Sequence, residues 1–348
     1  MNPLILVTGG TGYIGSHTVV ELMESGFDVV IIDNLSNSSI EVLDRIEKIT
    51  GKRPLFEKLD LCDKTSLDQF FARYTSIEAV IHFAASKAVG ESVEKPLLYY
   101  RNNLLSLINL LEGMIASEIR HLVFSSSCTV YGQPDHLPVT ENSPVKPALS
   151  PYGNTKQVSE EIIRDTISSN APLRAISLRY FNPIGAHPSG LIGELPLGVP
   201  NNLVPFITQT AAGIRKELLV FGNDYSTPDG TAIRDYINVV DLSKAHVVAI
   251  QRLLNLRQKA PYEVFNLGTG RGYSVLEIIK TFEKVTGVKI NYRITCRRPG
   301  DIEKVWADTS LANHELGWKA EKTLEETLAS AWKWEQYYRK NLSGNPNP

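Results

Sequence analysis

The chain has 348 residues, of which 43% are hydrophobic and 21% charged, and its formal net charge is −2. This length is enough for a large core and favours two domains. The near-neutral charge and the lack of a basic run argue against nucleic acid or an anionic membrane as a partner. The three cysteines form no CxxC pair and the histidines no HExxH motif, so no disulfide framework or metal site is expected. Without a signal peptide or an apolar span of ~18 residues, we expect a soluble, cytoplasmic protein.

Residues 4–33 have the pattern of a dinucleotide-binding unit. An apolar strand runs into a glycine cluster, a helix-like stretch follows, and a second apolar strand ends in an acid. Gly9, Gly12 and Gly15 recur every third position, which lets backbone N–H groups approach a pyrophosphate at the helix N-terminus. Asp33 can accept hydrogen bonds from the adenosine ribose and would repel a 2′-phosphate, so NAD is favoured over NADP. A flexible turn is the alternative interpretation of the glycines.

Further strand-like runs alternate with helix-like stretches, at residues 55–59, 79–83, 122–124 and 174–178. This series predicts an α/β protein with a doubly wound parallel sheet of the Rossmann type, whose sites lie beyond the carboxyl ends of the strands. Ser127 and Asn182 each follow a strand closely. The topology therefore places both residues at the active edge of the sheet.

Polar residues near two other strand ends have two interpretations each. Asn37 and Ser38 could contact the phosphates of a cofactor or cap a helix. Asp60, followed by the apolar Leu61, could bracket an adenine ring or serve as a helix N-cap. The small residues 84–86 after the fourth strand would let a cofactor pass close to the backbone.

The pattern becomes irregular after the sixth strand, because proline and glycine crowd residues 183–200. A smaller, mixed α/β C-terminal domain for the substrate is expected there. The predicted division is a dinucleotide-binding domain over 1–182 with 236–268 returning to it, a substrate domain over 183–235 and 269–340, and a frayed tail over 341–348. Ser274 with Glu277, and Thr323 with Glu326, have the spacing of capping boxes that open two helices.

Tyr152 and Lys156 carry the predicted chemistry. Four residues apart on a helix, they share a face, so the ammonium can lie near the phenol. The pKa of a tyrosine is near 10, too high for a base at neutral pH. A cation at ~4 Å with an effective dielectric constant of ~20 contributes ~4 kcal/mol, which would bring the phenol to roughly 7, and an oxidised nicotinamide would act in the same direction. Ordinary helix-surface residues are the alternative.

Four motifs together resemble the extended short-chain dehydrogenase/reductase family: GGTGYIG (9–15), SSSCTVYG (125–132), PYGNTK (151–156) and RYFNPIGAH (179–187). Later motifs are similar to those of the UDP-glucose 4-epimerases in this family: PNNL (200–203), FGNDY (221–225), DGTAIRDYINVVDL (229–242) and RRPGD (297–301). The resemblance extends from Leu4 to about Trp318. It implies a bound NAD, a UDP-sugar substrate and reversible inversion at sugar C4, as between UDP-glucose and UDP-galactose.

Matched residue by residue, the resemblance implies three sets of site residues. The catalytic set is Ser127, Tyr152 and Lys156. The expected cofactor contacts are Gly9, Gly12, Tyr13, Ile14, Gly15, Asp33, Asn34, Asn37, Ser38, Asp60, Leu61, Phe83, Ala84, Lys87, Asn102, Ser125, Tyr152, Lys156 and Tyr180. The expected substrate contacts are Ser127, Tyr152, Asn182, Asn202, Leu203, Leu219, Phe221, Arg234, Tyr236, Arg298, Asp301 and Val305.

Some of these substrate residues also have simpler interpretations. Arg234 and Arg298 suit a diphosphate, but either could be a surface ion-pair partner. Asp301 could bind the uridine ribose or pair with Arg298. In the enzymes that this chain resembles, the position of Val305 lies beside the sugar C2 substituent; a residue smaller than tyrosine there suggests that N-acetylated sugars also fit, unless Val305 only packs in the core.

Assembly is a further expectation. The helix over 96–114 and the helix after Tyr152 carry apolar residues beyond one face, for example Leu104, Leu107, Leu110 and Leu111. The resemblance implies a homodimer in which this helix pair forms a four-helix bundle with its mate. The alternative is burial within the monomer.

Three rival functions are considered. A nucleotide-sugar 4,6-dehydratase needs an extra acid and base, yet residues 127–130 carry no carboxylate. A UDP-glucuronate decarboxylase needs recognition of a sugar carboxylate that we do not locate. A non-catalytic NAD-sensing regulator has no need of Ser127, Tyr152 and Lys156 together.

Overall fold

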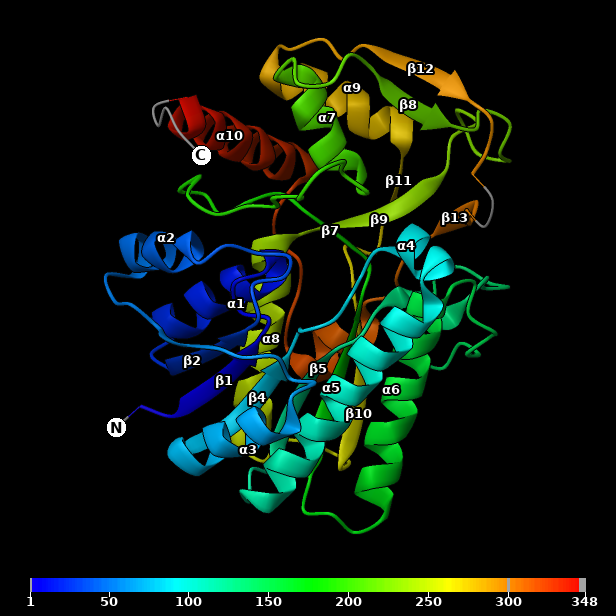
Figure 1. Ribbon diagram of the computed structural model, residues 1–348. Coiled ribbons are helices and arrows are strands. Elements are labelled where there is room, and N and C mark those ends of the chain that lie inside the picture. Colours follow the sequence, from blue (N-terminus) through cyan, green and yellow to red (C-terminus); the bar gives the residue numbers. More distant parts are fainter. Residues whose placement is uncertain (1, 299–300, 344–348) are drawn as a thin grey trace.

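The chain folds around a seven-stranded parallel sheet in a computed structural model that describes residues 2–298 and 301–343 (Figure 1). The strand order is β10-β6-β5-β4-β1-β2-β3, and every neighbouring pair is parallel. The order reverses between β1 and β4, where doubly wound sheets bind ligands. The predicted fold class is confirmed. The strands are β1 (Leu4–Thr8), β2 (Asp28–Asp33), β3 (Leu55–Lys58), β4 (Ile77–His82), β5 (His121–Ser125), β6 (Arg174–Tyr180) and β10 (Tyr262–Leu267).

Helices cover both faces of this sheet (Figure 1). Successive side chains of the strands alternate between two apolar cores: Ile5 and Val7 of β1 belong to one core and Leu6 to the other. The first core is completed by α1 (Tyr13–Glu24), α2 (Glu41–Thr50), α8 (Val239–Leu254) and the short π-helical segment η2 (Ala312–Leu316), and the second by α3 (Lys64–Arg73), α5 (Pro96–Ala116) and α6 (Pro151–Ser168).

A smaller region lies over the carboxyl edge of the large sheet (Figure 1). Its strand β9 pairs with three others, and a separate two-stranded sheet is formed by β8 and β12. The elements are β7 (Asn182–Ile184), α7 (Leu203–Ala211), β8 (Leu218–Phe221), β9 (Ile233–Asn238), β11 (Gly272–Ser274), α9 (Val275–Thr286), β12 (Tyr292–Thr295), β13 (Lys304–Val305) and α10 (Leu324–Ser343). Two short helices, α4 (Val89–Glu94) and the 3₁₀ turn η1 (Cys128–Tyr131), border the same edge.

The segment 236–268 connects the two regions. β10 joins β6 in the large sheet and α8 packs in the core with α1, whereas β9, from which α8 continues, pairs with β7 in the small sheet. The exact domain division stays a prediction.

Both predicted capping boxes are confirmed. At the start of α9, Ser274 and Glu277 exchange side-chain and backbone hydrogen bonds. At the start of α10, the Thr323 N–H donates to Glu326 (2.9 Å) and the Glu326 N–H donates to the Thr323 hydroxyl (3.2 Å). α10 continues to Ser343, so the predicted tail starts too early at residue 341; residues 344–348 lie outside the described part. Within the described residues, no helix is long and apolar enough to cross a membrane.

Candidate active site

The glycine loop brings open backbone to the N-terminus of α1. Gly9 has φ +71°, and a Cβ on it would lie 2.8 Å from the Ala84 nitrogen. A Cβ on Gly15 would overlap the Gly9 carbonyl oxygen. Gly12 caps α1 without a side-chain hydrogen bond, so no side chain competes for the N–H groups of the first turn. This cradle fits a pyrophosphate, with Tyr13 and Ile14 as the first residues of the helix.

Asp33 is fixed at the end of β2 by three donors. Its carboxylate accepts hydrogen bonds from the Thr11 N–H (3.2 Å), the Leu35 N–H (2.9 Å) and the Ser38 hydroxyl (3.2 Å). A carboxylate has about four acceptor sites, so capacity remains for a ribose. Asn37 is exposed. Neither Asn37 nor Ser38 caps α2, which excludes the capping alternative for both.

Asp60 lies beside Asn34, as two expected contacts of the same cofactor should. Its carboxylate accepts hydrogen bonds from the Asn34 side chain (3.1 Å) and the Cys62 N–H (2.8 Å). The N-cap alternative for Asp60 is wrong, because Asp63 caps α3 and accepts from the N–H of residue 66 (3.2 Å). Leu61 is buried in the second core.

The predicted catalytic residues meet beyond β5 and β6. Ser127 follows β5, and Tyr152 and Lys156 occupy the first two turns of α6. Tyr152 is buried and hydrogen-bonds Ser127. Lys156 donates to the Ser125 carbonyl oxygen (2.7 Å), and the Tyr180 hydroxyl lies 2.8 Å from the Ser125 hydroxyl. Two further expected cofactor contacts therefore border the catalytic set.

The expected lowering of the Tyr152 pKa by Lys156 is not found in the chain itself. Burial raises the pKa of Tyr152 above its ordinary value, and nearby Tyr180 adds to the rise, whereas the hydrogen bond with Ser127 opposes it. Burial also lowers the pKa of Lys156 to about 8, against the attraction of Glu160. The prediction is wrong because it counted one Coulombic pair and neglected the burial of both groups.

A partly buried carboxylate connects expected cofactor and substrate residues. Glu194 accepts a hydrogen bond from Asn202 (2.6 Å) and pairs with Lys87 (3.7 Å). The Lys87 ammonium lies 5.9 Å from the ring centre of Tyr13, whose hydroxyl donates to the Gly185 carbonyl (2.7 Å). Sequence reasoning missed Glu194, because no feature of its loop distinguishes it from a surface acid.

Loop contacts around Asn102 reveal a second missed residue. Asn102 donates to the Ser86 hydroxyl (3.0 Å). Its buried neighbour Asn103 accepts from the Ser86 N–H (2.8 Å) and donates to the Thr155 hydroxyl (3.0 Å), which ties the loop after β4 to α6. On that loop, the ring of Phe83 lies 4.7 Å from the ring of His246, and Ala84 follows.

Several expected substrate residues lie on paired strands of the smaller region. Asn182 pairs with Tyr236 across β7 and β9, and Arg234 pairs with Val305 across β9 and β13. Burial raises the pKa of Tyr236 to about 12, while the positive charges of Arg234 and Arg298 oppose that rise, so both guanidinium groups lie close to this phenol.

Arg298 and Asp301 pair with each other, as the simpler interpretation of Asp301 predicted. The guanidinium donates to both carboxylate oxygens (3.0 and 3.3 Å) and lies 4.8 Å from the ring centre of Phe221. Arg234 donates to the backbone carbonyl of its neighbour Ile233 (2.9 Å). Residues 299 and 300 of the RRPGD motif lie outside the described part. Two of the expected substrate contacts are leucines: Leu203 is the first residue of α7, and Leu219 lies in β8.

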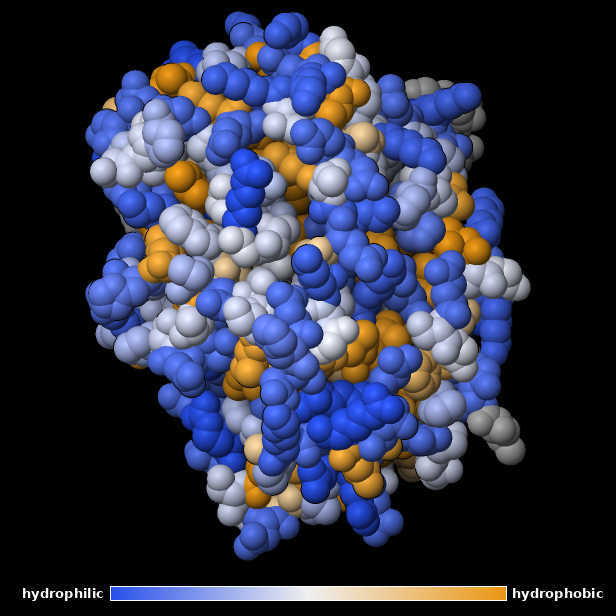
Figure 2. Space-filling model, turned by 180° about the vertical axis from the view of Figure 1, so that it is seen from behind, coloured by the Kyte–Doolittle hydropathy of each residue, from blue (hydrophilic) through white to orange (hydrophobic). Residues whose placement is uncertain are grey.

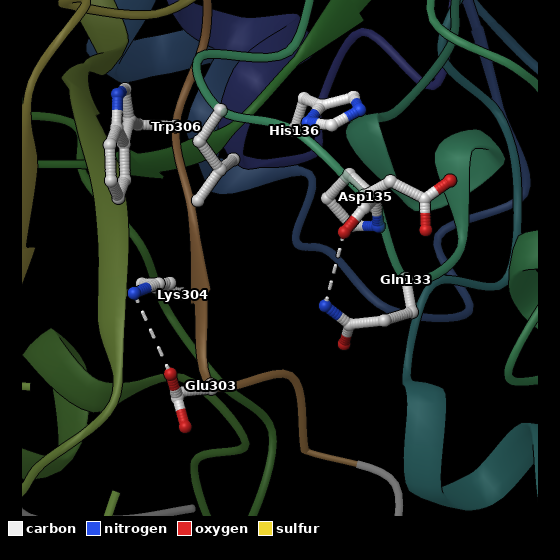
Figure 3. A pocket seen from close by; sticks show the side chains of 8 residues that line it. Gln133, Asp135, His136, Glu303, Lys304 and Trp306 are labelled. Carbon is white, nitrogen blue, oxygen red and sulfur yellow. Dashed lines mark hydrogen bonds and ion pairs between the residues drawn. The ribbon is translucent and has the colours of Figure 1, made fainter. Parts of the chain in front are cut away.

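Val305 is 5% exposed and packs in an apolar cluster with Tyr131, Phe181 and the partly buried Cys128. Because Cys128 directly follows Ser127, this cluster backs the catalytic edge. An open pocket of about 480 Å³ adjoins this cluster, since Leu137 belongs to both (Figure 3). It is lined by Gln133, Pro134, Asp135, His136, Leu137, Glu303, Lys304 and Trp306. None of these eight residues belongs to the expected site.

A Rossmann-type sheet with a glycine cradle, and with serine, tyrosine and lysine at its carboxyl edge, defines the class of nucleotide-dependent enzymes that the extended short-chain dehydrogenase/reductase motifs indicated. The family model for GDP-mannose 4,6 dehydratase matches residues 6–331. The UDP-glucose 4-epimerase of Bacillus subtilis (strain 168) is 54% identical over 331 residues, 95% of this chain and 96% of that protein. The chain belongs to the UDP-glucose 4-epimerase family.

Solved structures of UDP-glucose 4-epimerases are similar to this chain in fold as well as in sequence. The structure of the UDP-glucose 4-epimerase from Bifidobacterium longum in complex with NAD+ and UDP is 48% identical with a TM-score of 0.92, covering 98% of this chain and 100% of that one. That of the UDP-Glc/GlcNAc 4-epimerase from Campylobacter jejuni is 36% identical with a TM-score of 0.82, covering 97% of this chain and 100% of that one.

Proposed function

We propose that the chain is an NAD-dependent UDP-glucose 4-epimerase, which interconverts UDP-glucose and UDP-galactose through a transient 4-keto sugar. The observation that carries the proposal is the meeting of Ser127, Tyr152 and Lys156 at the edge of the sheet that faces the smaller region. The similarity to UDP-glucose 4-epimerases over nearly the whole chain supports it.

The chain supplies a base and a hydrogen-bond donor to the sugar. In our proposal Tyr152 takes the proton from O4, Ser127 hydrogen-bonds the same oxygen, and Lys156 holds the nicotinamide ribose. The α1 cradle and Asp33 would hold NAD, which when bound would supply the acceptor and donor of the C4 hydride. Because burial raises the pKa of Tyr152, base catalysis needs a further positive charge in the site, and oxidised nicotinamide carries one.

The smaller region would bind the UDP moiety. We assign Arg234 and Arg298 to the diphosphate, since guanidinium groups bind phosphates as bidentate donors. Asp301 would give up one of its two hydrogen bonds from Arg298 and accept hydrogen bonds from the uridine ribose hydroxyls instead. The side chains of Phe221 and Asn182 would complete the walls, together with Asn202, Leu203, Leu219 and Tyr236.

The rival functions lack the groups that they need. A 4,6-dehydratase would need an acid and a base beside Ser127, but the next three residues are Cys128, Thr129 and Val130. Burial raises the pKa of the Cys128 thiol to about 12, so it is a poor acid–base group near neutral pH. A binding-only regulator does not explain why three catalytic side chains converge.

A direct assay tests this function. Purified protein should interconvert UDP-glucose and UDP-galactose without added cofactor, and denaturation should release NAD. Dehydration of the sugar would contradict the proposal. So would an interconversion that requires added NAD and releases a keto sugar into solution.

We further propose activity on the N-acetylated pair of UDP-hexosamines. Val305 is smaller than tyrosine and lies in the cluster behind the catalytic edge. Since a packed wall closes only partly around lost volume, we expect room for an acetamido group beside Val305. The 36%-identical relative from Campylobacter jejuni is described as a UDP-Glc/GlcNAc 4-epimerase.

Val305→Tyr should reduce the N-acetyl activity by at least about tenfold and largely retain the UDP-glucose activity, because one misfit group costs ~1–3 kcal/mol. The kcat/KM values for both substrate pairs measure this. Val139→Ile, in the same apolar cluster, is the control for altered packing. Equal losses for both pairs in Val305→Tyr would remove Val305 as the determinant.

A homodimer through α5 and α6 is also proposed, with a corrected set of contact residues. Leu107, Leu110 and Leu111 are buried within the monomer, contrary to their expected role, and Leu104 is only partly exposed. Four of the five exposed large apolar residues of α5 instead follow a heptad-like spacing, Leu98, Leu105, Ile108 and Ile115, while Leu97 lies outside it. Over α1, α2 and α8 on the opposite face, apolar side chains occur in small groups among hydrophilic ones (Figure 2).

Sedimentation at micromolar concentration should therefore give the mass of a dimer, and Leu105→Glu with Ile108→Glu should convert it to a monomer, because charges would be buried in the bundle. Ile294→Glu, on β12 and similarly exposed at 41%, is the matched control and should leave the dimer intact. A monomeric wild-type protein would refute the bundle.

A cytoplasmic location completes the proposal. Cys62, Cys128 and Cys296 are all free thiols. Free thiols persist in a reducing compartment such as the cytoplasm.

A further inference from the structure

A buried polar network lies directly beneath the catalytic edge. Glu160 and Arg179 form an ion pair whose side chains are 3% and 5% exposed. Arg179 donates to both carboxylate oxygens of Glu160, through Nε at 2.9 Å and Nη2 at 2.5 Å. Ser126 donates to the same carboxylate at 2.6 Å. Sequence reasoning assigned no role to any of these three residues.

Each member of this network is a close neighbour of an expected site residue. Ser126 precedes Ser127 at the end of β5, and Arg179 precedes Tyr180 at the end of β6. Glu160 lies one helical turn after Lys156 on α6. Arg179 and Tyr180 are successive residues of β6, so their side chains point to opposite sides of that strand, and Ser126 and Ser127 directly follow β5. The network therefore holds these two chain segments from the side of Arg179, opposite Tyr180.

Among the described residues, three titratable side chains face the carboxylate of Glu160. Arg179 faces it from β6, Lys156 from its own helix, and Tyr262 from β10. Tyr131 accepts a hydrogen bond from Arg179 (3.0 Å), and His82 of β4 faces Lys156 but stays neutral, since burial lowers its pKa to about 3. Glu160 is the carboxylate whose attraction opposes the effect of burial on Lys156.

Stability alone is a weak reason for such an arrangement. Removing two charges from water costs several kcal/mol per ion, and well-packed apolar residues often replace a buried pair without loss. We infer that Glu160 is a positioning residue: through Ser126 and Arg179 it fixes the strand ends that carry Ser127 and Tyr180, and its charge keeps Lys156 an ammonium. The reaction in which this matters rests on the proposed function.

Glu160→Gln tests the inference, because glutamine can still accept from Ser126 but carries no charge. The alkaline limb of the kcat–pH profile, expected near pH 8 where Lys156 loses its proton, should move about one unit lower, as loss of an adjacent charge predicts. The KM for UDP-glucose should change little. Ser126→Ala, which removes a hydrogen bond and no charge, should lower kcat without moving the limb.

A matched control exists elsewhere in the fold. Arg252 and Glu263 form an ion pair of similar burial, with side chains 9% and 10% exposed, between α8 and β10. Glu263→Gln should lower the melting temperature yet leave the alkaline limb in place. If both glutamine variants give the same pH profile, Glu160 is merely structural and the inference is overturned.

A second readout separates this inference from the proposed function. The pH dependence of reductive methylation at Lys156, followed by peptide mass spectrometry, reports its protonation whether or not the protein turns over a sugar. If Lys156 is labelled at lower pH in Glu160→Gln than in Glu263→Gln, the inference is supported even in an inactive protein. An identical pH dependence in the two variants overturns it. If Glu160→Gln does not fold, Glu160→Asp replaces it: reduced kcat with an unmoved limb supports the positioning role, and full activity contradicts it.

Discussion

Turnover of UDP-glucose should fall by about 10²–10⁴-fold when Tyr152 is replaced by phenylalanine, the loss typical of a missing general base. The substitution removes one hydroxyl from a buried side chain and adds nothing to the site. UDP-sugar affinity and the content of tightly bound NAD should stay near the wild-type values, because Arg234, Arg298 and the α1 cradle are unchanged.

Tyr74→Phe is the matched control for this result. Tyr74 directly follows α3, and its hydroxyl donates to Glu57 of β3 (3.0 Å). Because neither residue belongs to the expected site, the variant should keep wild-type turnover. Steady-state kcat, together with NAD released on denaturation, measures both variants. A Tyr152→Phe enzyme that retains its rate would show that another group takes the O4 proton.

Acid should unfold the protein steeply below about pH 6.5, because three histidines are buried in the neutral form. Burial lowers the pKa of His17 to about 3, of His82 to about 3 and of His246 to about 4. Between these values and 6.5 the unfolded state binds the extra protons, so the free energy of unfolding falls as pH falls. Each histidine contributes about 1.4 kcal/mol per pH unit.

Several carboxyls act in the opposite direction. Burial raises the pKa of Glu21 to about 7, and it also raises the pKa of Glu141, Glu194, Asp235 and Asp241. A single substitution therefore isolates the histidine effect better than the total slope does. The loss between pH 6.5 and 5 should be smaller by about 2 kcal/mol in His246→Gln than in wild type. Urea unfolding at several pH values measures it. An unchanged slope in His246→Gln would contradict a neutral His246.

The order of strands and helices along the chain could be predicted because it depends on local sequence signals. Unbroken apolar strands, the glycine loop and the capping-box residues Ser274 and Glu277 act within a few residues, and each corresponds to the element predicted. The strand-end rule likewise placed Ser127 at the correct edge.

Long-range contacts could not be predicted in this way. The spacing of Tyr152 and Lys156 indicated a shared helix face, but the pKa of each depends on burial by strands that are distant in sequence. Glu160 and Arg179 are 19 positions apart and appear in the sequence as two ordinary charges. Leu107 was misassigned because helical periodicity does not distinguish a monomer core from a subunit contact.

Isotope retention at sugar C4 tests the central claim most directly. UDP-glucose deuterated at C4 should yield UDP-galactose that keeps the deuterium at C4, since the same hydrogen leaves and returns within one site. In deuterated water, unlabelled substrate should acquire no deuterium at C4. Loss of the label to solvent, or solvent deuterium at C4 or C5, would contradict epimerisation through a transient 4-keto sugar.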